Sequence, residues 1–381
     1  MQLAKLLPTD RPKHKRLKGE IFMKNFGVKS NAADVIFTNV TKVYGQNSVA
    51  VDQISFNVNA GELMTLLGPS GCGKTTTLRM IAGVEAATSG TIVIGDSDVT
   101  NRPASDRDVS MVFQSYALFP HKTVFENVCY GLIFSGLSKT DAEEKAKSGL
   151  ELVGLEHLKT RFPSELSGGQ QQRVAVARAL VLEPQVLLFD EPLSNLDAKL
   201  RRSVRDEIRD LQQRLNLTVV YVTHDQEEAL AVSDRIIVMD EGKISQIGSP
   251  RELYEQPKSL FVANFIGDSN ILPCTISGSS KKEKVLTIGQ LKIKKTDVSV
   301  KNGATSVLIR PEHIKLTRKA TTSTLAGTIK KATYIGSKVE YNIETSVGTV
   351  FVVSLSDQQE FGAGENIFLK LAPEKLNILD A

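Results

Sequence analysis

GPSGCGKTT, at residues 68–76, is the stretch that decides the fold of this chain. It matches the pattern G-x-x-x-x-G-K-[ST] at Gly68, Gly73, Lys74 and Thr75. The backbone N–H groups of such a loop must approach phosphate oxygens closely, so glycine is needed where a Cβ would intrude. The helix that follows turns its positive end toward the anion. The apolar run ELMTLL before the loop and the helical pattern KTTTLRMIAGV after it supply the strand–loop–helix context, which a chance match in a glycine-rich loop would lack.

This loop predicts binding of a nucleotide together with a metal ion. Lys74 is expected to reach the β- and γ-phosphates, and the Thr75 hydroxyl can ligate Mg²⁺. The cofactors predicted are therefore ATP and Mg²⁺. The nucleotide-binding residues expected in the loop are Gly68, Pro69, Ser70, Gly71, Cys72, Gly73, Lys74, Thr75 and Thr76.

A second motif, VLLFDEP at residues 186–192, ends an apolar run in two carboxylates. In open α/β sheets ligands bind at the carboxyl ends of the strands, which is where Asp190 and Glu191 would lie. We expect Asp190 to hold Mg²⁺, directly or through water, and Glu191 to orient or deprotonate the attacking water. Alone, an acidic pair after an apolar run is more often a solvated turn. Its position downstream of a phosphate-binding loop favours a catalytic site.

The chain contains two consecutive regions with different sequence patterns. From Asp34 onward strand-like runs alternate with helical patterns, which predicts a largely parallel sheet covered on both faces. Residues 123–182 read as mainly helical, and RIIVMDEGKISQIG as a hairpin around Glu241 and Gly242. After about residue 260 short segments such as KVLTIG, SVLIRPEHIKL and KVEYNIET alternate with turn residues, which is typical of a small β-barrel or sandwich.

Composition sets the outer limits of the interpretation. The 381 residues predict two domains, and 41% hydrophobic with 24% charged residues is ordinary for a globular protein. No run reaches the roughly 18–20 apolar residues that span a bilayer, so a membrane role would come through partners. A net charge of +4 is too small to indicate nucleic acid, and three separated cysteines form neither a disulfide framework nor a metal-ligand pair.

The first residues form a basic segment whose role stays open. No apolar core follows its basic residues, so we expect no signal peptide. The segment could contact anionic lipid or an acidic partner surface, or it could be a solvated, poorly ordered end. Translation could also begin at Met23, which would leave the preceding stretch without function.

LSGGQQQR, at residues 166–173, gives the chain its family resemblance. Together with the two motifs above, it resembles the nucleotide-binding subunits of the ABC transporter family. The resemblance implies that Ser167, Gly168, Gly169 and Gln170 contact the γ-phosphate of an ATP held by a second copy. Glycines and a helix N-terminus suit that contact. A homodimer that sandwiches two nucleotides would follow, with two-fold symmetry.

Four further residues match elements of the same family. Tyr44 matches the aromatic residue that stacks on adenine, although a tyrosine at a strand end is the simpler alternative. Gln114 matches the glutamine that senses Mg²⁺ and the attacking water, and the segment after it is expected to face the membrane subunits. Asp197 lies in a loop resembling the one that crosses the dimer interface. His224 matches the histidine that contacts the γ-phosphate, and neutral imidazole can do so without adding a titrating acid. The expected catalytic residues are Glu191, His224 and Gln114, and the expected metal-binding residues are Thr75, Gln114 and Asp190.

The resemblance also implies a fold and a domain division. The fold class is α/β: a P-loop NTPase cassette, with a RecA-like core and antiparallel β and helical subdomains, followed by a C-terminal all-β OB-like barrel domain. We expect a basic extension at residues 1–33, the cassette at 34–262 and the C-terminal domain at 263–381. The last would regulate the motor or brace its dimer.

The function implied is ATP hydrolysis coupled to import. The subunit would act at the cytoplasmic side of the inner membrane with integral-membrane permease subunits and, indirectly, a solute-binding protein. LLFDEPLSNLDAKLRRSVRDEIRDLQ and SMVFQSYALFPHKTVFENV look most like ATPases of ferric-iron importers. Polyamine, phosphonate, sulfate and sugar systems share much of this sequence and stay open as alternatives. A non-transport ABC switch protein and an inactive binding module are the other readings. Intact Glu191 and His224 count against the inactive module.

Overall fold

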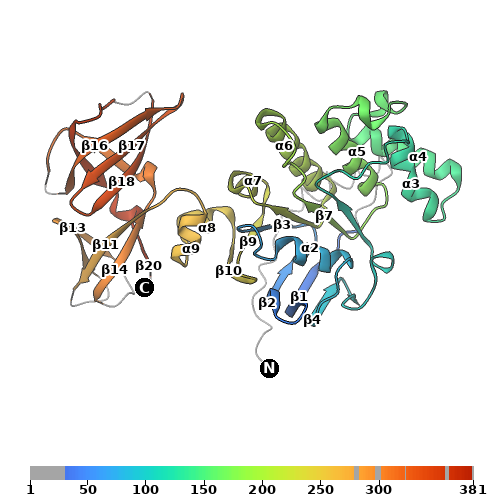
Figure 1. The fold of residues 1–381 in the computed structure, drawn as a ribbon, viewed down its shortest axis with the longest axis horizontal. Coiled ribbons are helices and arrows are strands. Elements are labelled where there is room, and N and C mark those ends of the chain that lie inside the picture. Colours follow the sequence, from blue (N-terminus) through green and yellow to red (C-terminus); the bar gives the residue numbers. More distant parts are fainter. Residues whose placement is uncertain (1–30, 279–282, 297–301, 322, 357–359, 380–381) are drawn as a thin grey trace. The chain divides into compact units, whose positions relative to one another are not determined.

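The computed structural model describes residues 31–278, 283–296, 302–321, 323–356 and 360–379. Residues 1–30, which hold most of the predicted basic extension, lie outside this range. The chain forms two compact units, residues 1–250 and 251–381, each with its own layers of secondary structure (Figure 1). None of the helices in the described parts of the chain has the length and apolar character of a membrane-spanning segment.

The N-terminal unit is built on a six-stranded sheet in which five strands are parallel. Every residue of the strands that flank the site most closely, β3 and β8, is buried, which is why both read as unbroken apolar runs. The predicted hairpin forms between β9 and the antiparallel β10, with Glu241 and Gly242 in left-handed backbone at its turn. In spatial order the strands are β10 (Lys243–Gly248), β9 (Arg235–Asp240), β3 (Leu63–Leu67), β8 (Val219–Thr223), β7 (Val186–Asp190) and β6 (Val109–Val112).

A second, antiparallel sheet covers α2 (Lys74–Ala82), the helix after the phosphate-binding loop. Leu78 and Ile81 of this helix share one apolar core with Val51 and Ile54 of the antiparallel sheet and with Leu66 of β3. The loop is therefore held between two sheets. The antiparallel sheet contains β2 (Ser48–Val58), β1 (Val35–Tyr44), β4 (Ser89–Ile94) and β5 (Ser97–Asp98), in that order.

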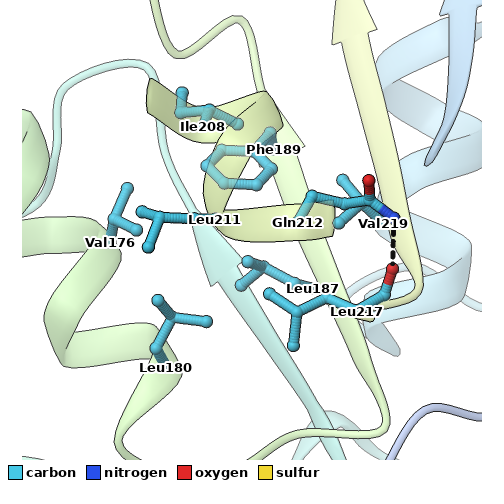
Figure 2. A pocket seen from close by; sticks show the side chains of 9 residues that line it. All are labelled: Val176, Leu180, Leu187, Phe189, Ile208, Leu211, Gln212, Leu217 and Val219. Carbon is cyan, nitrogen blue, oxygen red and sulfur yellow. Dashed lines mark hydrogen bonds between the residues drawn. The ribbon is translucent and has the colours of Figure 1, made fainter. Parts of the chain in front are cut away.

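Three helices between residues 124 and 180 form a helical subdomain with its own core, as the sequence predicts. They are α3 (Val124–Phe134), α4 (Lys139–Leu152) and α5 (Gly168–Leu180), and each begins at a hydroxyl residue that caps its first turn. Two more helices, α6 (Ala198–Leu215) and α7 (Gln226–Val232), follow β7 and β8. A small void of about 10 Å³ lies between side chains of α5, α6 and β7, with Leu217 and Val219 also lining it (Figure 2).

The C-terminal unit consists of two five-stranded antiparallel sheets that share one apolar core. SVLIRPEHIKL, which reads as one segment in the sequence, is divided at Pro311 by a short 3₁₀ turn, so that β14 and β15 join different sheets. The first sheet is β13 (Leu291–Thr296), β12 (Glu283–Ile288), β11 (Asn270–Ser277), β14 (Gly303–Ile309) and β20 (Asn377–Leu379). The second is β15 (Ile314–Thr317), β19 (Asn366–Leu371), β16 (Thr324–Tyr334), β17 (Lys338–Thr345) and β18 (Gly348–Leu355). An α/β part followed by an all-β part confirms the predicted fold class.

Arg310 ties two short helices at the start of the second unit, α8 (Pro250–Glu255) and α9 (Leu260–Phe265), to the end of β14. Its side chain is 2% exposed and lies over the Tyr254 ring, with the guanidinium carbon 4.1 Å from the ring centroid. The oxygen atoms that accept its hydrogen bonds belong to Tyr254, Ala263, Gly267, Asp268 and Ser269. The compact units divide at residue 250, whereas the sequence places the boundary after 262. That boundary and the regulatory role of residues 263–381 stay predictions.

Replacing Arg310 by Met should remove these hydrogen bonds while keeping most of the aliphatic volume. We expect the free energy of unfolding of the C-terminal unit to fall by at least about 3 kcal/mol, because several buried carbonyl groups lose their donor. Urea denaturation followed by circular dichroism measures the loss. Arg318→Met is the matched control, since Arg318 also lies over an aromatic ring but is half exposed. An equal loss in both variants would contradict the role assigned to Arg310.

Candidate active site

The phosphate-binding loop runs from the end of β3 to the start of α2, and two of its glycines cannot carry a side chain. A Cβ at Gly68 would lie 2.3 Å from the carbonyl oxygen of Met239. Gly73 has φ +100°, and a Cβ there would lie 2.5 Å from the carbonyl oxygen of Ala50. The backbone of the loop can pass this close to β2 and β9 only because both positions are glycine. The cradle therefore has the form that a polyphosphate needs.

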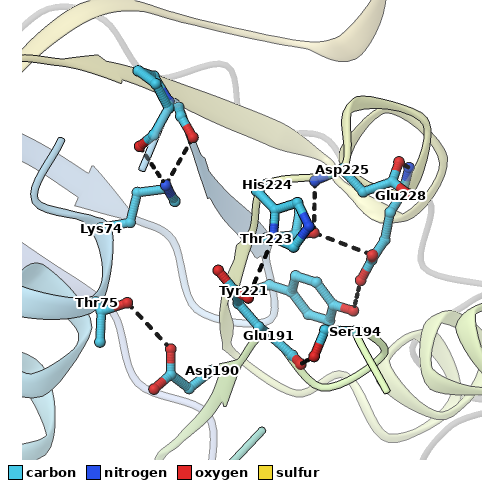
Figure 3. Close-up of polar contacts among 12 residues, drawn as sticks. Lys74, Thr75, Asp190, Glu191, Ser194, Tyr221, Thr223, His224, Asp225 and Glu228 are labelled. Atoms are coloured by element: carbon cyan, nitrogen blue, oxygen red, sulfur yellow. Dashed lines mark hydrogen bonds and ion pairs between the residues drawn. The ribbon is translucent and has the colours of Figure 1, made fainter. Parts of the chain in front are cut away.

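Lys74 directs its ammonium group back into this loop. Its Nζ donates hydrogen bonds to the carbonyl oxygens of Gly68 at 2.7 Å and Pro69 at 2.8 Å (Figure 3). The side chain is 6% exposed, so its charge is concentrated in the cradle together with the N-terminal end of α2. Both features favour an anion, and the residues present fit the phosphates of ATP. The Cys72 thiol lies 3.8 Å from the same Nζ, and burial raises the pKa of this thiol.

Thr75 and Asp190 form a pair of oxygen ligands at the edge of the loop. The Thr75 Oγ1 lies 3.4 Å from Oδ1 of Asp190, the last residue of β7. Burial raises the pKa of the Asp190 carboxyl, the positive charge of Arg79 lowers it, and the neighbouring Glu191 raises it. A half-buried carboxylate beside a hydroxyl suits Mg²⁺, which prefers oxygen ligands and is bound through one or two carboxylates.

Glu191 and His224 meet beyond the ends of β7 and β8. The Glu191 Oε2 lies 3.2 Å from Nδ1 of His224 (Figure 3). Glu191 has φ +45°, which a residue other than glycine rarely adopts, and its backbone N–H donates to the carbonyl oxygen of Val222 at 3.0 Å. Non-glycine residues in this region persist only where their surroundings hold them, and they concentrate at functional sites. The His224 side chain is 59% exposed, so it is accessible from solvent.

Gln114 is exposed just beyond β6, in a segment of unusual backbone. Its carbonyl oxygen accepts a hydrogen bond from Asn195 Nδ2 at 2.9 Å, which links it to the loop that follows Glu191. Tyr116 and Ala117, two and three residues later, have φ +61° and +49°. Arg178 donates to both of their carbonyl oxygens, at 2.9 and 2.7 Å. The segment is thus fixed from α5, and Gln114 leaves it on the exposed side.

Tyr44 ends β1 and is 38% exposed. The ammonium of Lys42 lies 4.8 Å from the ring centroid, a contact that we did not predict. The pattern K-V-Y indicates it, because residues two apart share one face of a strand.

Ser167 begins α5 and is engaged in its own cap. Its Oγ accepts from the Gln170 backbone N–H at 3.4 Å, and Gln170 Oε1 accepts from the Ser167 N–H at 2.9 Å. Gly168 and Gly169 form the first turn of the helix. Within the described part of the chain, no hydrogen bond or ion pair joins residues 167–170 to the loop at 68–76. Asp197 caps α6 in the same manner, accepting from Lys199 and Leu200.

Comparison with known proteins identifies the family. A family profile described as "ABC transporter" matches residues 51–194, and one described as "TOBE domain" matches residues 307–379. A relative from Rhizobium etli, named Fe(3+) ions import ATP-binding protein FbpC, is 54% identical over 347 residues, covering 91% of this chain and 98% of its own. The chain belongs to the ABC transporter family. An Agrobacterium fabrum protein of the same name is 56% identical over 319 residues, which are 84% of this chain and 90% of that one.

Solved structures agree with this assignment to the ABC transporters. The dimeric post-hydrolysis state of the ATP-binding cassette MJ0796, bound to ADP and Pi, is 34% identical with a TM-score of 0.51, covering 57% of this chain and 99% of that one. CbiO1 of Clostridium perfringens, part of the ABC transporter complex cbiONQ, is 28% identical with a TM-score of 0.54, covering 57% and 89%. The family profile, the relatives and these structures confirm the predicted ABC cassette and ATPase class, and the TOBE match confirms the OB-like class of the C-terminal part.

Replacing Asp190 by Asn should stabilise this ABC cassette in Mg²⁺-free buffer. The folded state raises the pKa of Asp190 above its ordinary value of 3.8, so the ionised carboxylate costs stability at any pH well above that value. We expect the melting temperature at pH 8 to rise by a few degrees in Asp190→Asn, and the difference to shrink as the pH falls toward 4. Differential scanning calorimetry in EDTA measures it. The exposed Asp206→Asn is the control, and a lower melting temperature in Asp190→Asn would contradict the account.

Proposed function

We propose that this chain is the ATP-hydrolysing subunit of an importer for ferric iron, acting as a homodimer on separate permease subunits. The observation that carries the proposal is the gathering of Lys74, Asp190, Glu191 and His224 at one edge of the sheet. Phosphoryl transfer requires a cation that binds the phosphates, a pair of oxygen ligands for a metal ion and a carboxylate–imidazole pair that orients the water. Family membership and the names of the relatives support the direction of transport and the cargo.

Binding comes from the loop and the strand end together. The loop amides and the Lys74 ammonium hold the β- and γ-phosphates, and the Tyr44 ring is placed to stack on adenine. Thr75, Asp190 and Gln114 would hold Mg²⁺, which supplies neutralisation of the phosphate charge. The ammonium exchanges its two carbonyl partners for phosphate oxygens, which are stronger acceptors because they are charged.

Glu191 is the general base of this proposal. Its carboxylate accepts the proton of the attacking water while His224, 3.2 Å away, orients the water and the γ-phosphate. Glu191 pairs with His224 while Asp190 lies beside Thr75, so that one carboxylate serves the water and the other the metal. Gln114, exposed just beyond β6, would be the further polar group that senses the metal ion and the water.

The second half of each site comes from another copy of the chain. Residues 167–170 form a helix N-terminus that suits an anion, and within the described part of the chain no hydrogen bond or ion pair joins them to the phosphate loop of the same chain. Placing that helix end on the γ-phosphate held by a partner gives two composite sites related by two-fold symmetry. The dimeric form of the MJ0796 cassette supports this arrangement. Asp197 lies at the exposed loop that would cross between the copies.

An exposed apolar patch around α3 is the proposed contact with the permease. Ile133 and Phe134 are 56% and 75% exposed, unusual for large apolar side chains of a single protein surface. Phe119, Tyr130 and Phe134 form a continuous run of ring contacts, with centroids 4.5 and 4.9 Å apart. This run begins in the segment after Gln114, so a partner on it would sense the nucleotide site. A peripheral location at the cytoplasmic face of the inner membrane follows from such a partner.

Glu191→Gln should keep ATP binding but lower turnover by at least about 100-fold, because the water loses its base while the phosphate cradle survives. Lys74→Ala should instead weaken binding itself. Steady-state hydrolysis and nucleotide titration separate the two effects. Glu227→Gln, an exposed acid on α7, is the matched control. Half the normal rate in Glu191→Gln would remove Glu191 from this role.

The cargo is tested with the assembled transporter. The subunit, its permease and candidate solute-binding proteins are reconstituted in vesicles, and ATP turnover is measured with each loaded binding protein. Ferric-loaded protein should stimulate turnover most. Stimulation by a polyamine-, phosphonate-, sulfate- or sugar-loaded protein instead would correct the cargo and leave the ATPase assignment intact.

A further inference from the structure

A buried carboxylate organises the turn that carries His224. Glu228, on α7, is 5% exposed, and its carboxylate accepts hydrogen bonds from the hydroxyl of Tyr221 and from Thr223 Oγ1, the latter at 3.1 Å (Figure 3). The Glu228 backbone N–H donates to Asp225 Oδ1 at 3.0 Å, and the Asp225 N–H donates to Thr223 Oγ1 at 3.0 Å. These bonds close a ring around residues 223–225, so the backbone of His224 has little freedom.

Stability alone is a poor reason for a carboxylate in this place. Burial raises the pKa of Glu228, which shows that the charged form is costly there, although the hydrogen bonds from Tyr221 and Thr223 lower it again. Apolar side chains of similar volume often stabilise a core as well as buried charged groups do. The carboxylate orients the end of β8 relative to α7, because both of its oxygens accept hydrogen bonds from β8.

Arg201, on α6, ties the same turn to the chain that follows Glu191. Its Nη2 donates to the carbonyl oxygen of Leu196 at 3.1 Å, and its Nη1 lies 3.4 Å from Asp225 Oδ2. Leu196 stands next to Asp197, the residue proposed to cross the dimer interface. The segments that follow the two reacting side chains, one after Glu191 and one after His224, therefore meet on a single guanidinium group.

From this geometry we propose that Glu228 and Arg201 are positioning residues for His224. Glu228 fixes the turn at residues 223–225 through hydrogen bonds in the protein core. Arg201 fixes the same turn through its contact with the loop at residues 193–197. Among the described residues, no hydrogen bond or ion pair joins Glu228 or Arg201 to the phosphate loop, so both act through the turn that carries His224. Movement of that loop when a second copy docks is passed through Arg201 to Asp225 and thus to His224. The inference rests on the proposed function, since it assigns His224 a role in ATP hydrolysis.

The test is a double-mutant cycle on the full-length protein with MgATP. Glu228→Gln and Arg201→Ala are made alone and together with His224→Ala, and kcat and KM are measured. Each single variant should lower kcat about tenfold, the scale typical of groups that orient a ligand-contacting side chain, with KM changed less than about twofold. In the His224→Ala background the same substitutions should lower kcat no further. Arg209→Ala, which removes the Asp234 contacts at 2.6 and 3.1 Å from the same helix, should leave kcat unchanged.

A spectroscopic measurement keeps the test informative if turnover falls to background. The chain has five histidines, so the imidazole signal of His224 can be assigned by its loss in His224→Ala. In ¹³C-labelled imidazole spectra this signal should shift in Glu228→Gln and Arg201→Ala but not in Arg209→Ala.

Three outcomes would overturn the inference. Unchanged kcat in Glu228→Gln and Arg201→Ala, or an unmoved His224 signal, would show that neither residue positions His224. Full multiplicative losses in the His224→Ala background would show that they act elsewhere. Wild-type kcat in His224→Ala would instead refute the proposed role of His224, and the inference would fall with it. The first two results leave the proposed function standing.

Discussion

Parallel pairing of β7 with β8 aligns the strand ends that carry the proposed catalytic side chains. Asp190 lies opposite Val222, and the Glu191 N–H donates to the Val222 carbonyl oxygen, so Glu191 and His224 leave neighbouring strands at the same level. β3 pairs on the other side of β8 and delivers the phosphate loop to the same edge. Slippage of any strand would bury a charge or expose apolar residues. The register of the sheet therefore sets the distances on which the chemistry depends.

Several features of this edge favour function over stability. Asp190 is held where burial raises its pKa, Glu191 adopts a backbone conformation that costs energy, and Lys74 is nearly buried. Each would be an unlikely choice for a protein selected for stability alone. The surrounding core, with every residue of β3 and β8 buried, supplies the apolar stabilisation that makes the strain tolerable.

The parts of the site that depend on short local sequence patterns could be predicted from the sequence. The phosphate loop, the apolar strand before Asp190 and the cap at Ser167 are set by neighbours in sequence, and the structure forms each of these elements. The contact between Glu191 and His224 depends on which strands pair, which no local pattern specifies. Glu228 and Arg310 were missed because a single charged residue in a helix or near a strand reads as surface until the fold buries it. Arg201 was missed because its partners, Leu196 and Asp225, are set by how α6 packs in the fold. The strand order of the C-terminal sheets could not be predicted, because no local pattern specifies which strands pair.

Mixed dimers test the central claim, that each hydrolysis site combines the phosphate loop of one copy with residues 167–170 of another. One dimer combines a Lys74→Ala chain with a Ser167→Arg chain, and the other combines a Lys74→Ala, Ser167→Arg chain with an unmodified one. ATP turnover of the two purified dimers is compared. The account predicts activity near half of normal in the first dimer, which keeps one complete composite site, and almost none in the second. Activity only in the second dimer would contradict it and place the whole site within one chain.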